Sequence, residues 1–341
     1  MINLLIFLVV VSGVILIARL VRVVELASAI RGVKHEEIQD KDNKMNAGLM
    51  IVFMIAFFAF CFWQYFSWRD KMLPESASEH GVDIDLLMDF NMAIIILVFF
   101  ITHILLFYFA AKYYFRKENK AYYFTHSNKL ELLWTSVPAV VLAIIIIYGL
   151  ATWNKITQPA PPDALTIEIY GKQFDWTARY TGPDGKLGNS NYRLIQGTNE
   201  LGLDSLDPHS LDDIIIKNEF HIPLGKAVNF IFRSRDVIHS AYFPHFRAQM
   251  NVVPGMATNL HFVPSITTAQ MRKKTGNPAF DYILLCNKIC GAAHWNMQMT
   301  IIVDEEDDYK TWLREQQPYF NMAAQIQEKS SETTEIVAAV N

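Results

Sequence analysis

The sequence predicts transmembrane α-helical hairpins followed by an all-β sandwich domain. Charged residues make up only 19% of the 341 residues and hydrophobic residues 52%, whereas a soluble globular protein carries about a quarter charged residues. Long apolar segments lie in the first half of the chain. Alternation of apolar and polar residues, the pattern of strands, dominates the second half.

Four segments without a charged residue are candidates for crossing a bilayer, which takes about 20 residues. They are residues 2–18, 47–68, 90–111 and 132–153. The first segment lacks a basic start and a small-residue cleavage site, so we interpret it as a retained helix and not a signal peptide. The chain is therefore expected to be an integral protein of the lipid bilayer.

Lys and Arg residues predict the orientation, because short loops rich in them stay on the inner side of a membrane. The first and third loops, residues 19–46 and 112–131, are rich in Lys and Arg, whereas residues 69–89 are mainly acidic. Both termini then lie outside. We therefore expect the bacterial inner membrane, with the N-terminus and the C-terminal domain on the periplasmic side.

The second half follows a proline-rich linker around Pro161 and predicts a sandwich of short strands. The strand pattern occurs at residues 165–169, 228–232, 259–263, 282–285 and 299–303. Residues 181–218 predict a hairpin arm or an inserted loop, and residues 308–316 a short amphipathic helix. The expected boundaries are 1–68 and 69–154 for two membrane hairpins, 155–320 for the exported domain and 321–341 for a disordered tail.

Charge and cysteine number exclude two classes of protein. A net charge of −4 argues against a nucleic-acid-binding protein, because such proteins collect a basic face. Three cysteines in a chain of this length cannot form a disulfide scaffold.

A cluster of soft metal ligands is the most informative motif. Cys286, Cys290, His294 and Met297 are spaced as Cys-x3-Cys-x3-His-x2-Met, and His239 lies upstream in the segment Asp-Val-Ile-His-Ser. Zinc rarely takes a thioether, whereas copper electron-transfer sites use methionine as a weak axial ligand. Two thiolates on one loop can bridge two copper ions that each carry one histidine. Met297 and a loop carbonyl would then be the weak ligands of the two copper ions. This ligand set suits electron transfer, because it leaves no coordination position open for a substrate.

Three other interpretations of these residues stay open. Two cysteines and two histidines also form structural zinc sites. Cysteines of an exported domain can form a disulfide, although Cys286 and Cys290 are close in sequence for that geometry. They can also be buried thiols without a metal.

The same residues resemble subunit II of the haem-copper cytochrome c oxidases, whose exported cupredoxin domain carries the dinuclear CuA centre. The loop from Cys286 to Met297 matches the ligand loop of that family position by position. Four more motifs extend the resemblance over roughly residues 82–316: Asp236 to Ser240, Pro254-Gly255, Gly171 to Trp176 and Glu131 to Pro138. The resemblance implies a Greek-key, cupredoxin-like sandwich behind one membrane hairpin, to which residues 1–68 add another.

The resemblance also implies a ligand set and partners. The ligands of two copper ions would be His239, Cys286, the backbone carbonyl of Lys288, Cys290, His294 and Met297. Electrons would arrive from a cytochrome c and pass to haem in subunit I, where oxygen is reduced and protons are pumped. The expected partners are subunit I, other oxidase subunits, the cytochrome c-type donor and the bilayer, with no nucleic acid and no haem in this chain.

Three residues outside the ligand set take roles from the resemblance. Glu131 aligns with a glutamate at the mouth of a proton-uptake path into subunit I, although a charge at a helix end can also simply face lipid headgroups. Phe174 stands where the family has the tryptophan through which electrons enter. Because it lacks the indole N–H, we expect the donor to dock differently, for example as a haem domain of a neighbouring complex. Trp176 is either a further electron relay or part of the core.

Lys288 departs from the family, which usually has a glutamate there that helps bind magnesium at the contact with subunit I. An ammonium group cannot ligate a hard cation, which argues against that magnesium site. The rival functions are a nitric oxide reductase with the same domain, a copper-free quinol oxidase subunit, and a membrane-tethered store of copper or zinc. The quinol oxidase subunit lacks the metal ligands, whereas all five ligating side chains are present here.

Overall fold

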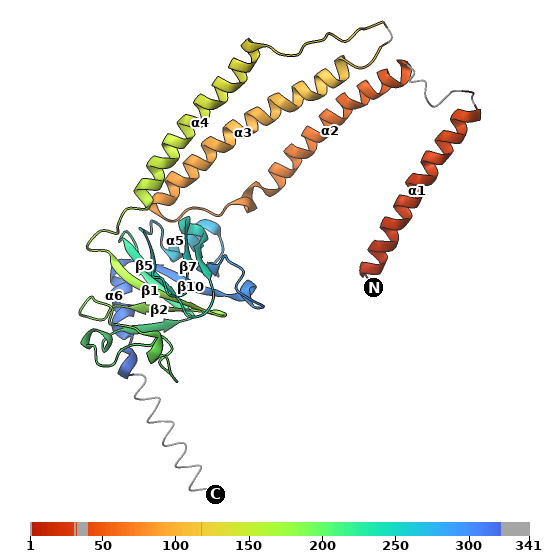
Figure 1. The fold of residues 1–341 in the computed structure, drawn as a ribbon. Helices are drawn as coiled ribbons and strands as arrows, with labels where there is room; N and C mark the ends of the chain where they lie inside the picture. Colours follow the sequence, from red (N-terminus) through yellow and green to blue (C-terminus); the bar gives the residue numbers. More distant parts are fainter. Residues whose placement is uncertain (1, 31, 33–39, 117, 322–341) are drawn as a thin grey trace. The chain divides into compact units, whose positions relative to one another are not determined.

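The computed structural model describes residues 2–30, 32, 40–116 and 118–321 (Figure 1). The described chain divides into two compact units. The helical unit comprises Met1–Arg69 and Ala93–Leu133, and the second unit comprises Asp70–Met92 and Trp134–Asn341 and contains the β domain. Apart from Asn321, the predicted disordered tail lies outside the described residues, and the predicted domain boundaries stay predictions.

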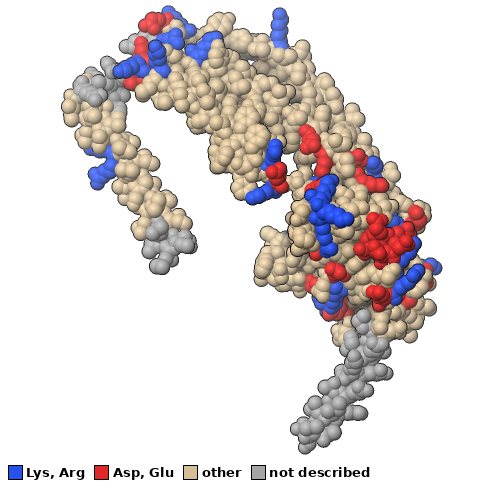
Figure 2. Space-filling model, turned by 180° about the vertical axis from the view of Figure 1, so that it is seen from behind, with Lys and Arg blue, Asp and Glu red and all other residues tan. Residues whose placement is uncertain are grey.

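Four long helices occur in the described part of the chain before the β domain. They are α1 (Ile2–Ile30), α2 (Asp40–Met72), α3 (Glu79–Lys112) and α4 (Asn128–Ile156). Each is long and apolar enough to cross a membrane, which confirms the prediction of apolar spanning helices. The helices extend beyond the apolar segments, and Figure 2 shows charged side chains gathered near helix ends and on the β domain.

The β domain is a sandwich of two five-stranded sheets in the region that the structure describes. The first sheet has the strand order β3-β2-β1-β5-β8. Its strands are β1 (Leu165–Lys172), β2 (Asp175–Tyr180), β3 (Ile214–Lys217), β5 (Val228–Ser234) and β8 (Thr258–Phe262). β1 pairs with β5 in parallel, and the other neighbours are antiparallel.

The second sheet has the strand order β4-β10-β9-β6-β7. Its strands are β4 (Glu219–Pro223), β6 (His239–Phe243), β7 (Ala248–Val252), β9 (Tyr282–Cys286) and β10 (Gln298–Asp304). Two short helices accompany it, α5 (Thr268–Thr275) and α6 (Glu306–Glu315). β6 therefore lies beside β9, and this pairing brings His239 close to Cys286.

The core lies between the inner faces of the two sheets. Phe230 of β5 is fully buried, and its ring centroid lies 5.1 Å from those of Phe243 and Phe262. Val228 and Phe232 are buried on the same face of β5, as the alternation of a strand requires. This aromatic core holds the two sheets together, and β6 and β9 belong to the second of them.

The predicted strands in the second half coincide with β1, β5, β8, β9 and β10. The segment 181–218 is a hairpin arm only in part, because its last residues form β3, which pairs with β2. The apolar run Ile214 to Ile216 belongs to that strand. The predicted amphipathic helix at 308–316 corresponds to α6, where Tyr309 is buried against the sandwich.

The segment that leads into α3 is bound to the β domain. The N–H of Ala77 donates to the carbonyl of His245 (2.7 Å), and the Ser78 hydroxyl donates to the carbonyl of Phe246 (2.7 Å). The guanidinium of Arg247 binds both carboxylate oxygens of Asp85, at 2.7 and 3.0 Å. The start of α3 is therefore part of the same folded unit as the sandwich.

Candidate metal centre

The pairing of β6 with β9 brings His239 to Cys286. Ala241 lies opposite Cys286 in this antiparallel pair, and His239 is two residues before Ala241, so its side chain lies on the same face of the sheet. The Nδ1 atom of His239 is 3.8 Å from Sγ of Cys286. The first strand residue of β6 and the last of β9 thus form one side of the cluster.

The loop after β9 carries the other side of the cluster. Sγ of Cys290 lies 3.8 Å from Sγ of Cys286, 3.6 Å from Nδ1 of His294 and 3.8 Å from Sδ of Met297. The carbonyl oxygen of Lys288 is 3.3 Å from Sγ of Cys286. All six groups implied by the family resemblance are therefore brought together in one place.

Backbone hydrogen bonds fix this loop at both ends. The N–H of Cys286 donates to the carbonyl of Met297 (3.0 Å), and the N–H of Asn287 donates to that of Ser240 (3.0 Å). Residues 294–296 form a short 3-10 helix, at whose end the N–H of Met297 donates to the carbonyl of His294 (3.2 Å). The sheet and the backbone of the loop thus hold the candidate ligand residues in place.

The cluster is a set of closely spaced sulfur and nitrogen atoms. The two thiol sulfurs, 3.8 Å apart, are not bonded, because a disulfide needs about 2.05 Å. One atom each of His239, Cys286 and Cys290 lies within 4.8 Å of the others, a spacing that can hold a metal ion. Each imidazole presents Nδ1 to a different cysteine. The geometry therefore matches two sulfurs at the centre with one histidine on each side.

Burial separates the cluster from water except near His294. His239 and Met297 are at most 1% exposed, and the cysteines are 8% or less. Burial beside Cys286 raises the pKa of the Cys290 thiol to about 11. Metal binding must therefore displace a proton, because the thiolate is the ligand form.

Asp236 orients the ring of His239. Its carboxylate accepts hydrogen bonds from Nε2 of His239 (2.9 Å) and from the backbone N–H groups of Gln173 (2.7 Å) and Val237 (2.7 Å). Burial acts to raise the pKa of Asp236, but these hydrogen bonds outweigh it and lower the pKa. With Nε2 occupied by Asp236, Nδ1 of His239 faces Cys286.

Gln173 is a neighbour that the sequence analysis did not single out. Its side-chain amide donates to the backbone carbonyl of Cys290, while its own N–H binds Asp236. It therefore links the segment between β1 and β2 to both sides of the cluster. The only sequence signal for it is its position inside the Gly171 to Trp176 motif.

The two aromatic candidates for electron entry lie against the cluster in different ways. Trp176 is fully buried, and its ring centroid is 5.8 Å from that of His239. Phe174 is half-buried, and a Cβ atom added to Gly291 of the ligand loop would lie 2.7 Å from its ring. Phe174 thus supports the loop, whereas Trp176 lies beneath a histidine in the core.

Glu131 is an exposed residue in the first turn of α4 and belongs to the helical unit. The structure does not bring it into the sulfur–imidazole cluster. Its role stays a prediction.

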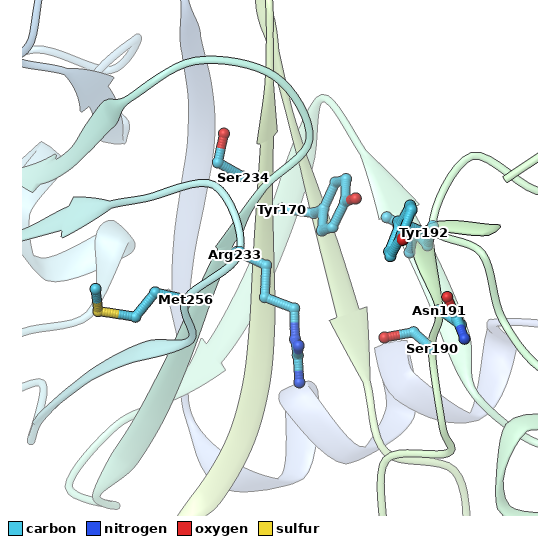
Figure 3. A pocket seen from close by; sticks show the side chains of 9 residues that line it. Tyr170, Ser190, Asn191, Tyr192, Arg233, Ser234 and Met256 are labelled. Carbon is cyan, nitrogen blue, oxygen red and sulfur yellow. The ribbon is translucent and has the colours of Figure 1, made fainter. Parts of the chain in front are cut away.

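A cavity of about 330 Å³ opens on the outer face of the first sheet (Figure 3). It is lined by Tyr170 and Arg233 from the sheet, Met256, and the segment 190–192 of the arm between β2 and β3. Ser234 also lines it, and its hydroxyl accepts a hydrogen bond from the N–H of Asp236 (3.3 Å). This cavity could not be predicted from the sequence, because its walls come from five segments that are separate in the chain.

The fold and the cluster together define a class: a membrane-anchored β-sandwich with a cysteine–histidine–methionine cluster that can hold a metal. Residues 66–152 match the transmembrane domain of cytochrome c oxidase subunit II, and residues 165–305 match its periplasmic domain. The chain belongs to the cytochrome c oxidase subunit II family. It is therefore a component of an oxidoreductase complex, as the sequence resemblance implied.

Similar proteins come from several bacteria. The alternative cytochrome c oxidase subunit 2 of Bradyrhizobium diazoefficiens is 38% identical over 213 residues, which cover 62% of this chain and 72% of that protein. The cytochrome c oxidase subunit 2 of Cereibacter sphaeroides is 27% identical over 254 residues, covering 70% of this chain and 78% of that protein. A solved periplasmic domain of cytochrome oxidase subunit II from Bradyrhizobium japonicum aligns over 46% of this chain and 95% of its own, with 24% identity and a TM-score of 0.31.

Proposed function

We propose that this chain is the electron-accepting subunit of a cytochrome c oxidase and that its cluster holds two copper ions. The observation that carries the proposal is the order of the ligand atoms. The two cysteine sulfurs are adjacent, one imidazole nitrogen lies beside each of them, and a thioether and a carbonyl oxygen complete the set.

The donor chemistry fits copper better than zinc. A structural zinc site closes with four cysteine or histidine ligands, which leaves no part for the buried Met297 beside Cys290. Thiolates, imidazoles and a thioether are the ligands of copper electron-transfer sites. Bound copper would supply one-electron redox chemistry.

Fixed positions of the ligand residues would keep electron transfer fast. His239 is fixed by Asp236, and both ends of the ligand loop are fixed by backbone hydrogen bonds. Burial excludes water from most of the cluster. Ligands that do not move between the oxidised and reduced states lower the reorganisation that electron transfer requires, as with other preorganised sites.

The electron path and the proton path belong to the same proposal. A cytochrome c-type donor, free or part of a neighbouring complex, delivers electrons near Phe174 and Trp176, and haem in subunit I receives them. Oxygen reduction and proton pumping take place in subunit I, with Glu131 at the mouth of a proton path. The distribution of Lys and Arg supports a bacterial inner membrane with the β domain on the periplasmic side.

Magnesium does not form part of the proposal. The side chain of Lys288 is exposed and cationic, and only its carbonyl oxygen faces the cluster. The carboxylate that would hold a hard cation is absent from this position.

The test compares two cysteine substitutions in the full-length chain. Cys290→Ser should remove the electron paramagnetic resonance signal of an electron shared by two copper nuclei, because one of the two sulfurs that would hold the copper ions is lost. Cys61→Ser is the matched control, since Cys61 lies in α2 and outside the cluster. An unchanged copper content and spectrum in Cys290→Ser would refute the ligand set. In the assembled complex, reduction of nitric oxide in place of oxygen would refute the oxidase assignment.

A further inference from the structure

A second cavity, of about 420 Å³, lies in the helical unit between α2 and the end of α3. The residues that define it here are Asn43, Asn46, Met50, Phe53, Ala110 and Tyr114. The α2 residues recur at a spacing that places them on one face of the helix. The cavity is therefore a groove along the contact of two helices that each can span a membrane.

The two ends of this groove differ in polarity. Met50, Phe53 and Ala110 give it an apolar floor, whereas Asn46 and Tyr114 give it a polar mouth. The side-chain amide of Asn43 donates to the carbonyl of Phe115 (3.2 Å) and joins the two segments at the mouth. Tyrosines of this kind gather at the membrane–water interface, so the floor faces the hydrocarbon region and the mouth faces the headgroups.

A basic side chain lies at the mouth. The guanidinium carbon of Arg116 lies 4.3 Å from the ring centroid of Tyr114, a residue of the groove. No carboxylate among the described residues forms an ion pair with Arg116. The charge of Arg116 therefore faces an anion at the mouth without a competing carboxylate among those residues.

We propose that this groove binds one anionic phospholipid. An acyl chain lies against Met50 and Phe53, and the headgroup phosphate lies at Arg116, whose planar guanidinium suits phosphate oxygens. The volume falls in the range of ligand sites, about 300–1,000 Å³. A helix of another subunit would use the apolar floor but not the basic mouth, whereas an anionic lipid uses both, as in other basic pockets between membrane helices.

The experiment measures lipids retained by the full-length chain after purification from bilayers of equal parts phosphatidylglycerol and phosphatidylcholine. The wild type should retain phosphatidylglycerol in preference to phosphatidylcholine. Arg116→Gln should lower the retained phosphatidylglycerol about fivefold, since a basic residue near the headgroups contributes about 1 kcal/mol. Arg19→Gln makes the same change on α1, outside the groove, and should retain the wild-type amount.

A second variant tests the floor of the groove. Ala110→Phe fills the cavity and should lower retention of phosphatidylglycerol at least as strongly, while the unfolding transition of the β domain stays unchanged. Equal retention of both lipids by the wild type, or equal losses in Arg116→Gln and Arg19→Gln, would overturn the proposal. A photo-reactive group at Ala110 that captures a polypeptide instead of phospholipid would overturn it as well.

Discussion

The carboxylate of Asp236 determines which nitrogen of His239 faces the sulfur atoms. Asp236→Asn keeps the shape but removes the charge, and its amide can no longer accept all the hydrogen bonds that hold the ring. Loss of such an outer partner lowers metal affinity about 10- to 100-fold. We expect that loss for copper, measured by competition with a chelator, with the β domain still folded.

Asp281→Asn provides the control for Asp236→Asn. Asp281 pairs with Arg272 at the surface, and both side chains are more than one-third exposed. This variant should bind copper as the wild type does. Equal copper affinity in Asp236→Asn and the wild type would contradict the orienting role of Asp236.

Phe174 gives a prediction about where electrons enter. Phe174→Trp restores the aromatic N–H that the family usually has at this position and should speed reduction of the centre by soluble cytochrome c. Stopped-flow absorbance of the copper centre measures the rate. Tyr192→Trp is the control, because Tyr192 is 73% exposed and lies outside the cluster, and it should leave the rate unchanged. An unchanged rate in Phe174→Trp would show that this position plays no part in donor docking.

At the scale of elements, Arg247 joins the start of α3 to the turn before β7. Its side chain is 8% exposed and binds Asp85, and it also donates to the carbonyl of Pro244 (2.6 Å). Arg247→Gln should lower the free energy of unfolding of the β domain by about 2 kcal/mol, because it removes a nearly buried cation from the half-buried Asp85 carboxylate and from the carbonyl of Pro244. Near-ultraviolet circular dichroism of the full-length chain in denaturant measures this change.

The exposed ion pair of Arg272 with Asp281 provides the comparison for Arg247. Arg272→Gln should lower the free energy of unfolding by less than about 1 kcal/mol. Similar losses in the two variants would show that the link between α3 and the sandwich is not specifically stabilising.

His245, in the same region, should make the free energy of unfolding depend on pH. Burial lowers its pKa to about 4 from 6.5, and the Arg247 charge acts in the same direction. Between these two pKa values the unfolded chain binds more protons than the folded chain. The free energy of unfolding therefore falls as the pH drops below 6.5. From pH 7 to pH 5 this amounts to about 2 kcal/mol at most.

Comparing His245→Phe with the wild type isolates this contribution. The loss of stability between pH 7 and pH 5, measured by denaturant unfolding, should be smaller in the variant because its side chain cannot bind a proton. An identical pH dependence in both proteins would assign the effect to other groups.

The elements that sequence could predict are those with a regular pattern. The apolar helices and strands such as β5, where Val228, Phe230 and Phe232 are buried at every second position, were predictable. The spacing of the loop from Cys286 to Met297 also predicted that its candidate ligand residues come together, as they do. Gln173 and the link from Arg247 to Asp85 were not, because these contacts join segments far apart in the chain.

In the whole molecule, we expect electron transfer to take place in the β domain and proton uptake at the membrane. Glu131→Gln should slow proton uptake by the assembled oxidase and leave the rate of copper reduction unchanged. Time-resolved pH-indicator absorbance follows the protons, and the copper absorbance follows the electrons. Glu118→Gln, in the loop before α4, is the matched control. Wild-type proton uptake in Glu131→Gln would remove that role.

The buried sulfurs of Cys286 and Cys290, with their neighbouring ligand atoms, would hold two copper ions as one redox centre. Metal analysis combined with a coulometric titration of the purified full-length chain tests this proposal. We expect two copper ions and one electron accepted per chain, since the two ions would share a single electron. A chain that contains zinc, a single copper ion or no metal, or that accepts no electron, would refute the proposed centre.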